Sequence, residues 1–149
     1  MVILNLTQHN PTPEQIEAGV VNLPDEMWAR VRELLTFEEI PNANQMASNA
    51  WEIARIAAEF FGSDASEDKF IGATMIGGAP YFMPFLVNAL MAWRIIPLFS
   101  FTKRVSVEEH RPDGTVEKRA VFRHEGWVDI TGAWEFVNSQ QSEEEEEEE

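Results

Sequence analysis

Two patterns of hydrophobic positions alternate along the chain. Short apolar runs bounded by turn residues predict buried strands at residues 2–6, 20–23, 70–76 and 95–101. Apolar residues spaced three or four positions apart predict helices at residues 12–18, 24–35, 42–61 and 84–93. The chain then returns to short strands, at residues 104–111, 115–124 and 127–130.

Local signals mark the ends of several elements. Thr12, Pro13 and Gln15 form a capping box with proline in the first helical position, so a short helix begins there. Gly62 follows the longest helical pattern and is placed as its C-cap. The Pro-Asp-Gly turn at residues 112–114 joins the two strands around it into a hairpin.

The order of the elements predicts the fold class. Strands that alternate with helices favour a parallel sheet covered on both faces. We therefore predict a small three-layer Rossmann-like α/β domain with a mainly parallel sheet and a C-terminal antiparallel β-hairpin. An α+β arrangement is the main alternative. Pro97 argues against an unbroken ladder through the strand at 95–101, because proline has no N–H to donate.

Composition limits what kind of protein this is. A chain of 149 residues that is 44% hydrophobic can bury one core, so we expect a single domain at residues 1–137. The absence of cysteine excludes disulfides and thiolate metal sites and fits a reducing cytoplasm. The first residues lack the pattern of a signal peptide, and the apolar run at 81–93 is too short to span a bilayer. We expect a cytoplasmic protein without membrane contact.

The net charge of −15 divides unevenly along the chain. Seven consecutive glutamates at 143–149 supply −7 of it, and we expect residues 138–149 to form a disordered acidic tail, either native or engineered. The acidic remainder argues against a nonspecific binder of duplex DNA or RNA. Six of the eleven basic residues lie between 103 and 124, which indicates a local site for an anion. The alternative is a solvated hairpin with alternating charges.

In a parallel sheet, the segments at 7–10, 77–80 and 100–104 would meet at one edge, beyond the carboxyl ends of the strands. This is the edge at which open α/β sheets bind ligands. Gly77 and Gly78 follow a buried strand and precede a helix, so their N–H groups and the positive helix end favour an anion. A histidine at this edge could transfer a proton, since histidine titrates near neutral pH. The candidate ligand-binding residues are Thr7, Gln8, His9, Gly77, Gly78, Ser100, Lys103, Arg104 and His124.

Several familiar sites are missing from the sequence. The glycine turn lacks the G-x-G-x-x-G spacing of dinucleotide folds and the Lys-Ser/Thr of a P-loop. The three histidines are scattered without paired carboxylates, so we predict neither a metal nor another cofactor. No Gly-x-Ser-x-Gly elbow occurs, and we assign no catalytic residue from the sequence.

Five short motifs carry a resemblance to known proteins. They are Asn5-Leu-Thr-Gln-His9, Thr12-Pro-Glu-Gln15, Ile76-Gly-Gly-Ala-Pro80, Pro97-Leu-Phe-Ser-Phe101 and Phe122-Arg-His124. With them the chain, up to about Asp129, resembles a family of small uncharacterised proteins of bacteria and phages, which implies no activity. The predicted architecture is also similar to CARF-type Rossmann-like domains, which recognise cyclic oligonucleotides in CRISPR defence and sometimes cleave them. That likeness is architectural and transfers no catalytic residue.

The helix at 84–93 predicts an interaction surface. Asn88 is its only polar residue before the final tryptophan, so either the preceding helices or a second subunit must cover it, and we predict a homodimer. The function that we expect is binding of a nucleotide or another phosphorylated ligand, with hydrolysis open. The alternatives are an acidic, non-enzymatic interaction protein, such as a phage-encoded inhibitor of a partner protein, and an oligomeric structural protein without ligand.

Overall fold

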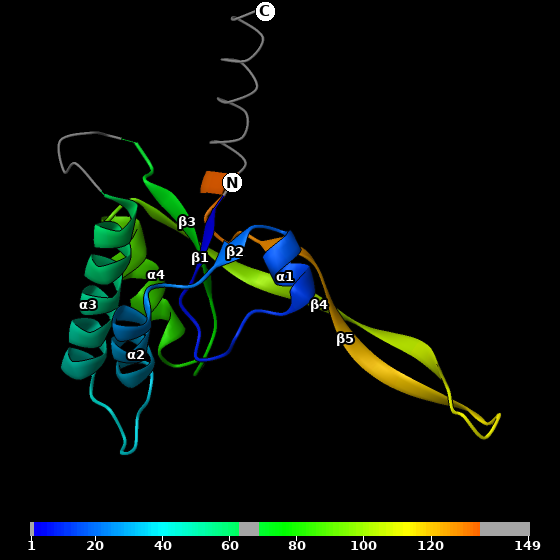
Figure 1. Cartoon of the computed structure of the whole chain (residues 1–149). Helices are drawn as coiled ribbons and strands as arrows, with labels where there is room; N and C mark the ends of the chain where they lie inside the picture. Colours follow the sequence, from blue (N-terminus) through cyan, green and yellow to red (C-terminus); the bar gives the residue numbers. More distant parts are fainter. Residues whose placement is uncertain (1, 63–68, 135–149) are drawn as a thin grey trace, which may run out of the picture.

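The computed structural model describes residues 2–62 and 69–134, which form a five-stranded sheet with the order β2-β1-β3-β4-β5 (Figure 1). The first four strands in this order are parallel, and the edge strand β5 is antiparallel to β4. Their bounds are β1 Ile3–Asn5, β2 Val20–Val21, β3 Gly72–Ile76, β4 Ile95–His110 and β5 Val116–Val128. The predicted α/β class, with a mainly parallel sheet and a C-terminal hairpin, is confirmed. The predicted acidic tail at 138–149 lies outside the described residues.

Four helices flank the sheet, and their bounds are α1 Pro13–Glu17, α2 Asp25–Leu34, α3 Ala43–Phe61 and α4 Met83–Ala92. Helices α2, α3 and α4 lie on one side of the sheet and α1 on the other (Figure 1). Both predicted caps are present: Thr12 and Gln15 form a reciprocal capping box, and Gly62 ends α3 in the left-handed conformation. In the described ranges no helix has the length and hydrophobicity to cross a bilayer.

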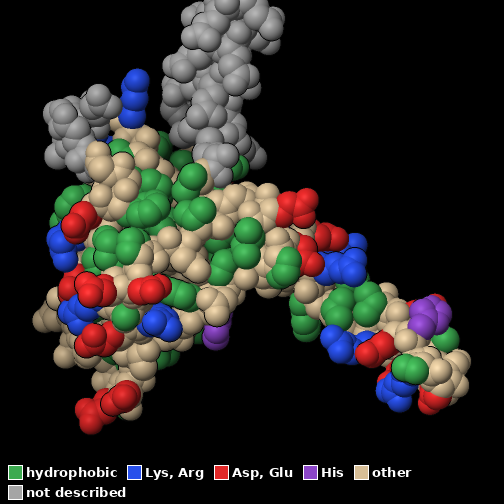
Figure 2. All heavy atoms as spheres, viewed as in Figure 1, with side chains coloured by type: hydrophobic (Ala, Val, Ile, Leu, Met, Phe, Trp, Pro, Cys, Tyr) green, Lys and Arg blue, Asp and Glu red, His purple; other side chains and the backbone are tan. Residues whose placement is uncertain are grey.

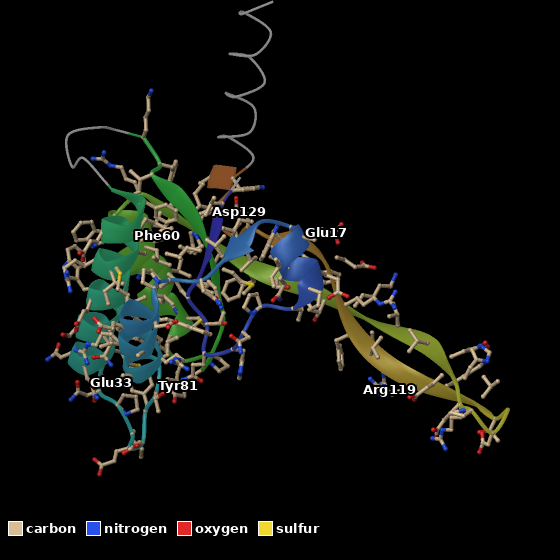
Figure 3. All side chains as sticks on the ribbon, in the orientation of Figure 1. Glu17, Glu33, Phe60, Tyr81, Arg119 and Asp129 are labelled. Atoms are coloured by element: carbon tan, nitrogen blue, oxygen red, sulfur yellow. The ribbon has the colours of Figure 1, made fainter. Side chains whose placement is uncertain are left out.

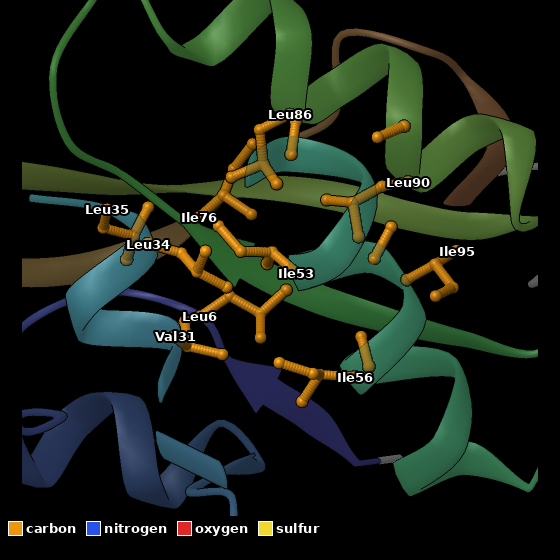
Figure 4. Packing of buried hydrophobic residues seen from close by; sticks show 14 of the residues in the cluster. Leu6, Val31, Leu34, Leu35, Ile53, Ile56, Ile76, Leu86, Leu90 and Ile95 are labelled. Atoms are coloured by element: carbon orange, nitrogen blue, oxygen red, sulfur yellow. The ribbon is translucent and has the colours of Figure 1, made fainter. Parts of the chain in front are cut away.

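The sheet lies between two hydrophobic cores, one on each face. The larger core lies between the sheet and α2, α3 and α4, where Leu6, Ile53, Leu86 and Leu90 are fully buried (Figure 4). The smaller core lies on the side of α1 and contains Ile3, Val20, Ala73, Met75, Ile96, Leu98 and Ala133. Because side chains alternate along a strand, odd-numbered residues of β1 and β3 and even-numbered residues of β4 face α1. The same odd and even alternation determines which of the site residues described below lie on one face of the sheet.

The C-terminal hairpin is longer than the sequence pattern predicts. The predicted strands at 95–101 and 104–111 are one continuous strand, β4, and Trp127 and Val128 end β5 and do not form a separate strand. Pro97 does not interrupt the sheet, because it pairs with Thr74 on one side and β5 pairs with β4 only from Phe99 onward. The outer part of the hairpin therefore projects far beyond the helices (Figure 1).

A β-bulge in β5 changes the register of this hairpin. Phe101 pairs with Gly126 but Thr102 pairs with His124, so Glu125 is an extra residue on β5. Without it, His124 would lie opposite Lys103 and point to the other face of the hairpin, because a one-residue slip reverses every side chain. The bulge thus places His124 on the face that carries Ser100 and α1.

Asn5 is a fully buried polar residue at the end of β1 that fixes the following loop. Its Oδ1 accepts from the N–H and the hydroxyl of Thr7 at 2.9 and 2.7 Å. Its Nδ2 donates to the carbonyl of His9 and to Oδ1 of Asn22, both at 2.9 Å. Four hydrogen bonds satisfy the amide and hold residues 7–9 against the sheet.

We expect Asn5→Ala to lower the free energy of unfolding by about 1–3 kcal/mol, because it leaves the partners of the amide without hydrogen bonds. Urea denaturation measures this loss. Asn10→Ala, in the same loop but exposed, is the control and should change stability by less than about 0.5 kcal/mol. Equal effects of the two substitutions would contradict the role given to Asn5.

Candidate ligand-binding site

Thr7, Gly77 and Ser100 lie side by side. Thr7 and Gly77 follow the carboxyl ends of β1 and β3, and Ser100 lies within β4. Met75 pairs with Asn5, and Ile76 pairs with Phe99, so continuing these registers puts Gly77 between Thr7 and Ser100. A Cβ atom on Gly77 would lie 3.8 Å from Cγ2 of Thr7, which confirms the contact. We call these three residues the strand-end row. Neighbouring strands are about 4.8 Å apart, so the glycine leaves a gap of about 10 Å between two hydroxyl side chains.

The N–H groups of the glycine turn are available at this row. Gly77 and Gly78 belong to neither a strand nor a helix, and none of the backbone hydrogen bonds outside those elements uses their N–H groups within the described part of the chain. Gly78 has φ of +148°, a conformation that L side chains rarely adopt. The turn then leads directly toward α4, so the sheet edge offers backbone donors beside Ser100.

Ser100 is the centre of a hydrogen-bonded group contributed by three elements. Its Oγ lies 2.6 Å from Nδ1 of His124 on β5 and 3.2 Å from Nε2 of Gln15 on α1. All three side chains are half-buried, so they are held in place but remain accessible to solvent. In sequence, Gln15 is 85 residues from Ser100, and only the packing of α1 near the base of the hairpin brings them together.

The capping box of α1 determines the direction of the hydrogen bond between Gln15 and Ser100. Oε1 of Gln15 accepts from the N–H of Thr12 at 2.9 Å, so its Nε2 faces Ser100 and donates. Ser100 Oγ is therefore an acceptor toward Gln15, while the donor in its 2.6 Å contact with Nδ1 of His124 depends on the tautomer of the imidazole, and a hydrogen on Nε2 makes Ser100 the donor. We assign His124 the tautomer that carries its hydrogen on Nε2.

The imidazole of His124 is partly shielded from solvent. Burial lowers its pKa below the ordinary 6.5, and the nearby carboxylate of Glu14 on α1 offsets part of that shift. The ring packs against Trp127, with 4.4 Å between the ring centroids. The imidazole is thus neutral at pH 7 and can accept a proton.

Arg104 and Phe122 extend the same face toward the projecting part of the hairpin. Residues 100, 102 and 104 of β4 alternate onto one face, so Arg104 lies about 13 Å beyond Ser100 along the strand. It pairs with Phe122, whose ring is 71% exposed. Among the described residues, no carboxylate forms an ion pair with Arg104. A free guanidinium beside an exposed ring is suited to a phosphate next to a base.

The neighbouring cation Lys103 lies on the opposite face. It pairs with Arg123 and forms a 3.9 Å ion pair with Glu125, the bulge residue. Other charges on the hairpin also have partners: Glu108 lies opposite Lys118, and Arg111 forms an ion pair with Glu117. Figure 2 shows both signs of charge interleaved on the projecting hairpin, and Figure 3 labels Arg119 on it. Much of the basic segment is thus a solvated hairpin, which is the alternative that the sequence left open.

The remaining predicted residues lie near the row without joining the hydrogen-bonded group. Gln8 donates to Oγ1 of Thr36 at the end of α2, and His9 is exposed, with its carbonyl bound by Asn5. The carbonyl of Thr7 accepts from the indole of Trp28 at 3.0 Å. Of the nine predicted residues, Thr7, Gly77, Ser100 and His124 are grouped, Gly78 adjoins them and Arg104 shares their face.

A pocket of 670 Å³ lies at the same glycine turn on the opposite side of the sheet. Gly77, Gly78, Pro80, Met83, Pro84, Val87, Asn88, Phe99 and Ile130 line it. Its side chains are apolar except for Asn88, so it lacks the converging polar groups of the strand-end row.

Sequence reasoning did not identify four contributors as site residues. Gln15 was recognised only as a helix cap, Glu14 and Trp127 only as parts of elements, and Phe122 only as part of a motif. These four residues come together only in the folded structure, through the packing of α1 and through the bulge in β5. No pattern in the sequence reports either event.

Comparison with known proteins assigns the chain to a family. No curated protein and no solved structure matches the chain at a significant level. One family model matches residues 1–128, which covers the whole sheet, the helices and the hairpin. The five motifs of the predicted resemblance lie within this range. The chain belongs to the uncharacterised protein MJ1673 family.

Proposed function

We propose that the protein binds a nucleotide or another phosphorylated ligand at the strand-end row. The observation that carries the proposal is the grouping of accessible donors at one sheet edge: the N–H groups of Gly77 and Gly78 and, in the assigned tautomer, Nε2 of His124. Each can donate to a phosphate oxygen, and the gap at Gly77 leaves room for one. Edges of this kind are where open α/β sheets bind ligands.

The second support for a nucleotide is the pairing of Arg104 with Phe122 on the same face. Arginine binds phosphate oxygens through two N–H groups, and an exposed ring offers a surface on which a base can stack. A simple phosphate would need only the donors of the row. The added ring therefore favours a ligand that carries a base, and its distance from Ser100 favours one longer than a mononucleotide.

We extend the proposal to a cyclic oligonucleotide bound by a homodimer, as in a sensor or nuclease of phage defence. The open side of α4 is the surface for a second copy: Pro84, Val87 and Ile130 are at least partly exposed beside it, and Phe101 and Val128 are exposed on the same face of the hairpin as Phe99. Phe82, Leu86 and Leu90 are buried against the neighbouring elements, so α3 and the sheet cover only one side of the helix. An exposed apolar strip of this kind is typical of an interface.

The binding proposal is tested by a thermal-shift screen of the whole chain against mononucleotides, linear dinucleotides, cyclic oligoadenylates and inorganic phosphate. A ligand at 100-fold excess over its Kd stabilises the folded state by about 2.7 kcal/mol. Arg104→Ala should weaken binding about tenfold or more, because it removes a charge-assisted hydrogen bond.

Lys103→Ala is the matched control, since it removes the same charge from the next residue but from the opposite face of the hairpin. Its affinity should stay within about twofold at fixed ionic strength. Equal losses in both variants would indicate nonspecific attraction. If no compound shifts the melting temperature, the proposal fails and the acidic interaction protein becomes the better hypothesis.

The dimer is tested separately by sedimentation equilibrium. We expect the wild-type chain to be a dimer and Val87→Asp to be a monomer, because a charge on the apolar strip would be buried without a partner. Ala47→Asp, on an exposed position of α3, is the control and should leave the dimer intact. A monomeric wild-type protein at micromolar concentration would contradict the proposed interface.

A further inference from the structure

We propose that Ser100 is a nucleophile and His124 its general base, and that together they cleave a phosphodiester bound at the strand-end row. The inference rests on the proposed function for its substrate class, but its evidence is the hydrogen-bonded group around Ser100. Neither residue belongs to a recognised catalytic motif, and the two meet only through the bulge in β5.

The proton of Ser100 is directed for transfer. Gln15 cannot accept it, because its oxygen is bound to the N–H of Thr12 and its nitrogen donates to Ser100. With the Nε2–H tautomer that we assign to His124, the hydroxyl hydrogen lies on the 2.6 Å line to Nδ1. A serine in hydrogen-bond contact with a base is the arrangement that activates an otherwise weak nucleophile.

The surroundings of His124 suit a base that is protonated only during the reaction. A desolvated imidazole is neutral at rest, so its Nδ1 lone pair is free to accept. The carboxylate of Glu14 on α1 favours the imidazolium that forms when the proton arrives. Trp127 packs against the ring and limits its rotation. The three elements β4, β5 and α1 thus contribute nucleophile, base and counter-charge.

The chemistry balances with water as the only further reactant. In the first step Ser100 Oγ bonds to phosphorus and its proton moves to Nδ1 of His124. The bond from phosphorus to one ester oxygen breaks, and that oxygen takes the proton from His124 and leaves as an alcohol. In the second step His124 deprotonates water, the water oxygen bonds to phosphorus, and Ser100 Oγ leaves with the proton.

The glycine turn supplies donors for the charge that develops on the phosphoryl oxygens. Gly77 lies directly beside Ser100 in the register of the sheet, and the N–H groups of Gly77 and Gly78 have no backbone partner in the described residues. Donors fixed before the reaction stabilise a transition state without reorganisation. Gly77 also carries no side chain that could block the approach to Oγ.

The inference is tested with a fluorophosphonate probe, which forms a bond from phosphorus to an activated serine with loss of fluoride. Intact mass spectrometry of the whole chain measures the adduct, and peptide mapping locates it. We expect labelling at Ser100 in the wild type and none in Ser100→Ala. Ser106→Ala is the control, because Ser106 lies on the same strand and face but is exposed and pairs with Ala120. Labelling of the wild type at any other serine would overturn the assignment.

A second measurement separates a base from a merely structural histidine. His124→Gln should slow labelling at least about 10²-fold while the melting temperature shows that the chain is folded. In the wild type the labelling rate should fall as the pH drops through the pKa of His124, which lies below 6.5, because the protonated ring cannot accept. A rate that ignores both the substitution and the pH in this range would overturn the role of His124.

The two proposals fail in different ways. If the thermal-shift screen finds a ligand and the folded wild type is not labelled, the row binds but Ser100 is no nucleophile. If Ser100 is labelled and no phosphorylated compound binds, the proposed function fails, and the phosphodiester substrate fails with it.

Discussion

The extra residue in β5 is the constraint on which the candidate site depends. A hairpin with regular register would put His124 opposite Lys103, on the face turned away from α1. Inserting Glu125 shifts the outer pairing by one residue and turns His124 toward Ser100. The local irregularity therefore decides which side chains of β4 and β5 share a face of the hairpin. Bulges are over-represented next to active sites.

A second constraint comes from the first turn of a five-residue helix. The capping box of α1 exists to satisfy N–H groups that a helix leaves unpaired. Because it fixes the oxygen of Gln15 on Thr12, it also fixes the amide nitrogen on Ser100. A helix-capping interaction thus sets the direction of the hydrogen bond from Gln15 to Ser100 in the candidate site. One side chain thus connects the cap of α1 to the hydroxyl oxygen of Ser100.

Much of the fold follows from sequence patterns, and the reasons are physical. Buried runs and capping signals located β1, β3, α1 and α3, since these elements are set by local propensity and one hydrophobic face. The continuity of β4 through Pro97 was not predictable, because it depends on where β5 begins to pair. The sequence predicted Ser100 and His124 as candidate ligand-binding residues but not their grouping. Its hydrogen bonds, and the separation of Arg104 from Lys103, depend on the bulge and on strand parity.

The two adjacent glycines of the turn differ in what they require, and this gives the pair an evolutionary meaning. Gly78 has a backbone angle that only glycine adopts without strain, so any homologue with this turn should keep it whatever its function. Gly77 has no such angle, and a methyl group there would make only ordinary contact with Thr7. The fold alone therefore permits alanine at position 77. If the proposed ligand binds at this turn, relatives that no longer bind it are free to diverge at Gly77 first, and their sequences would separate selection for binding from selection for folding.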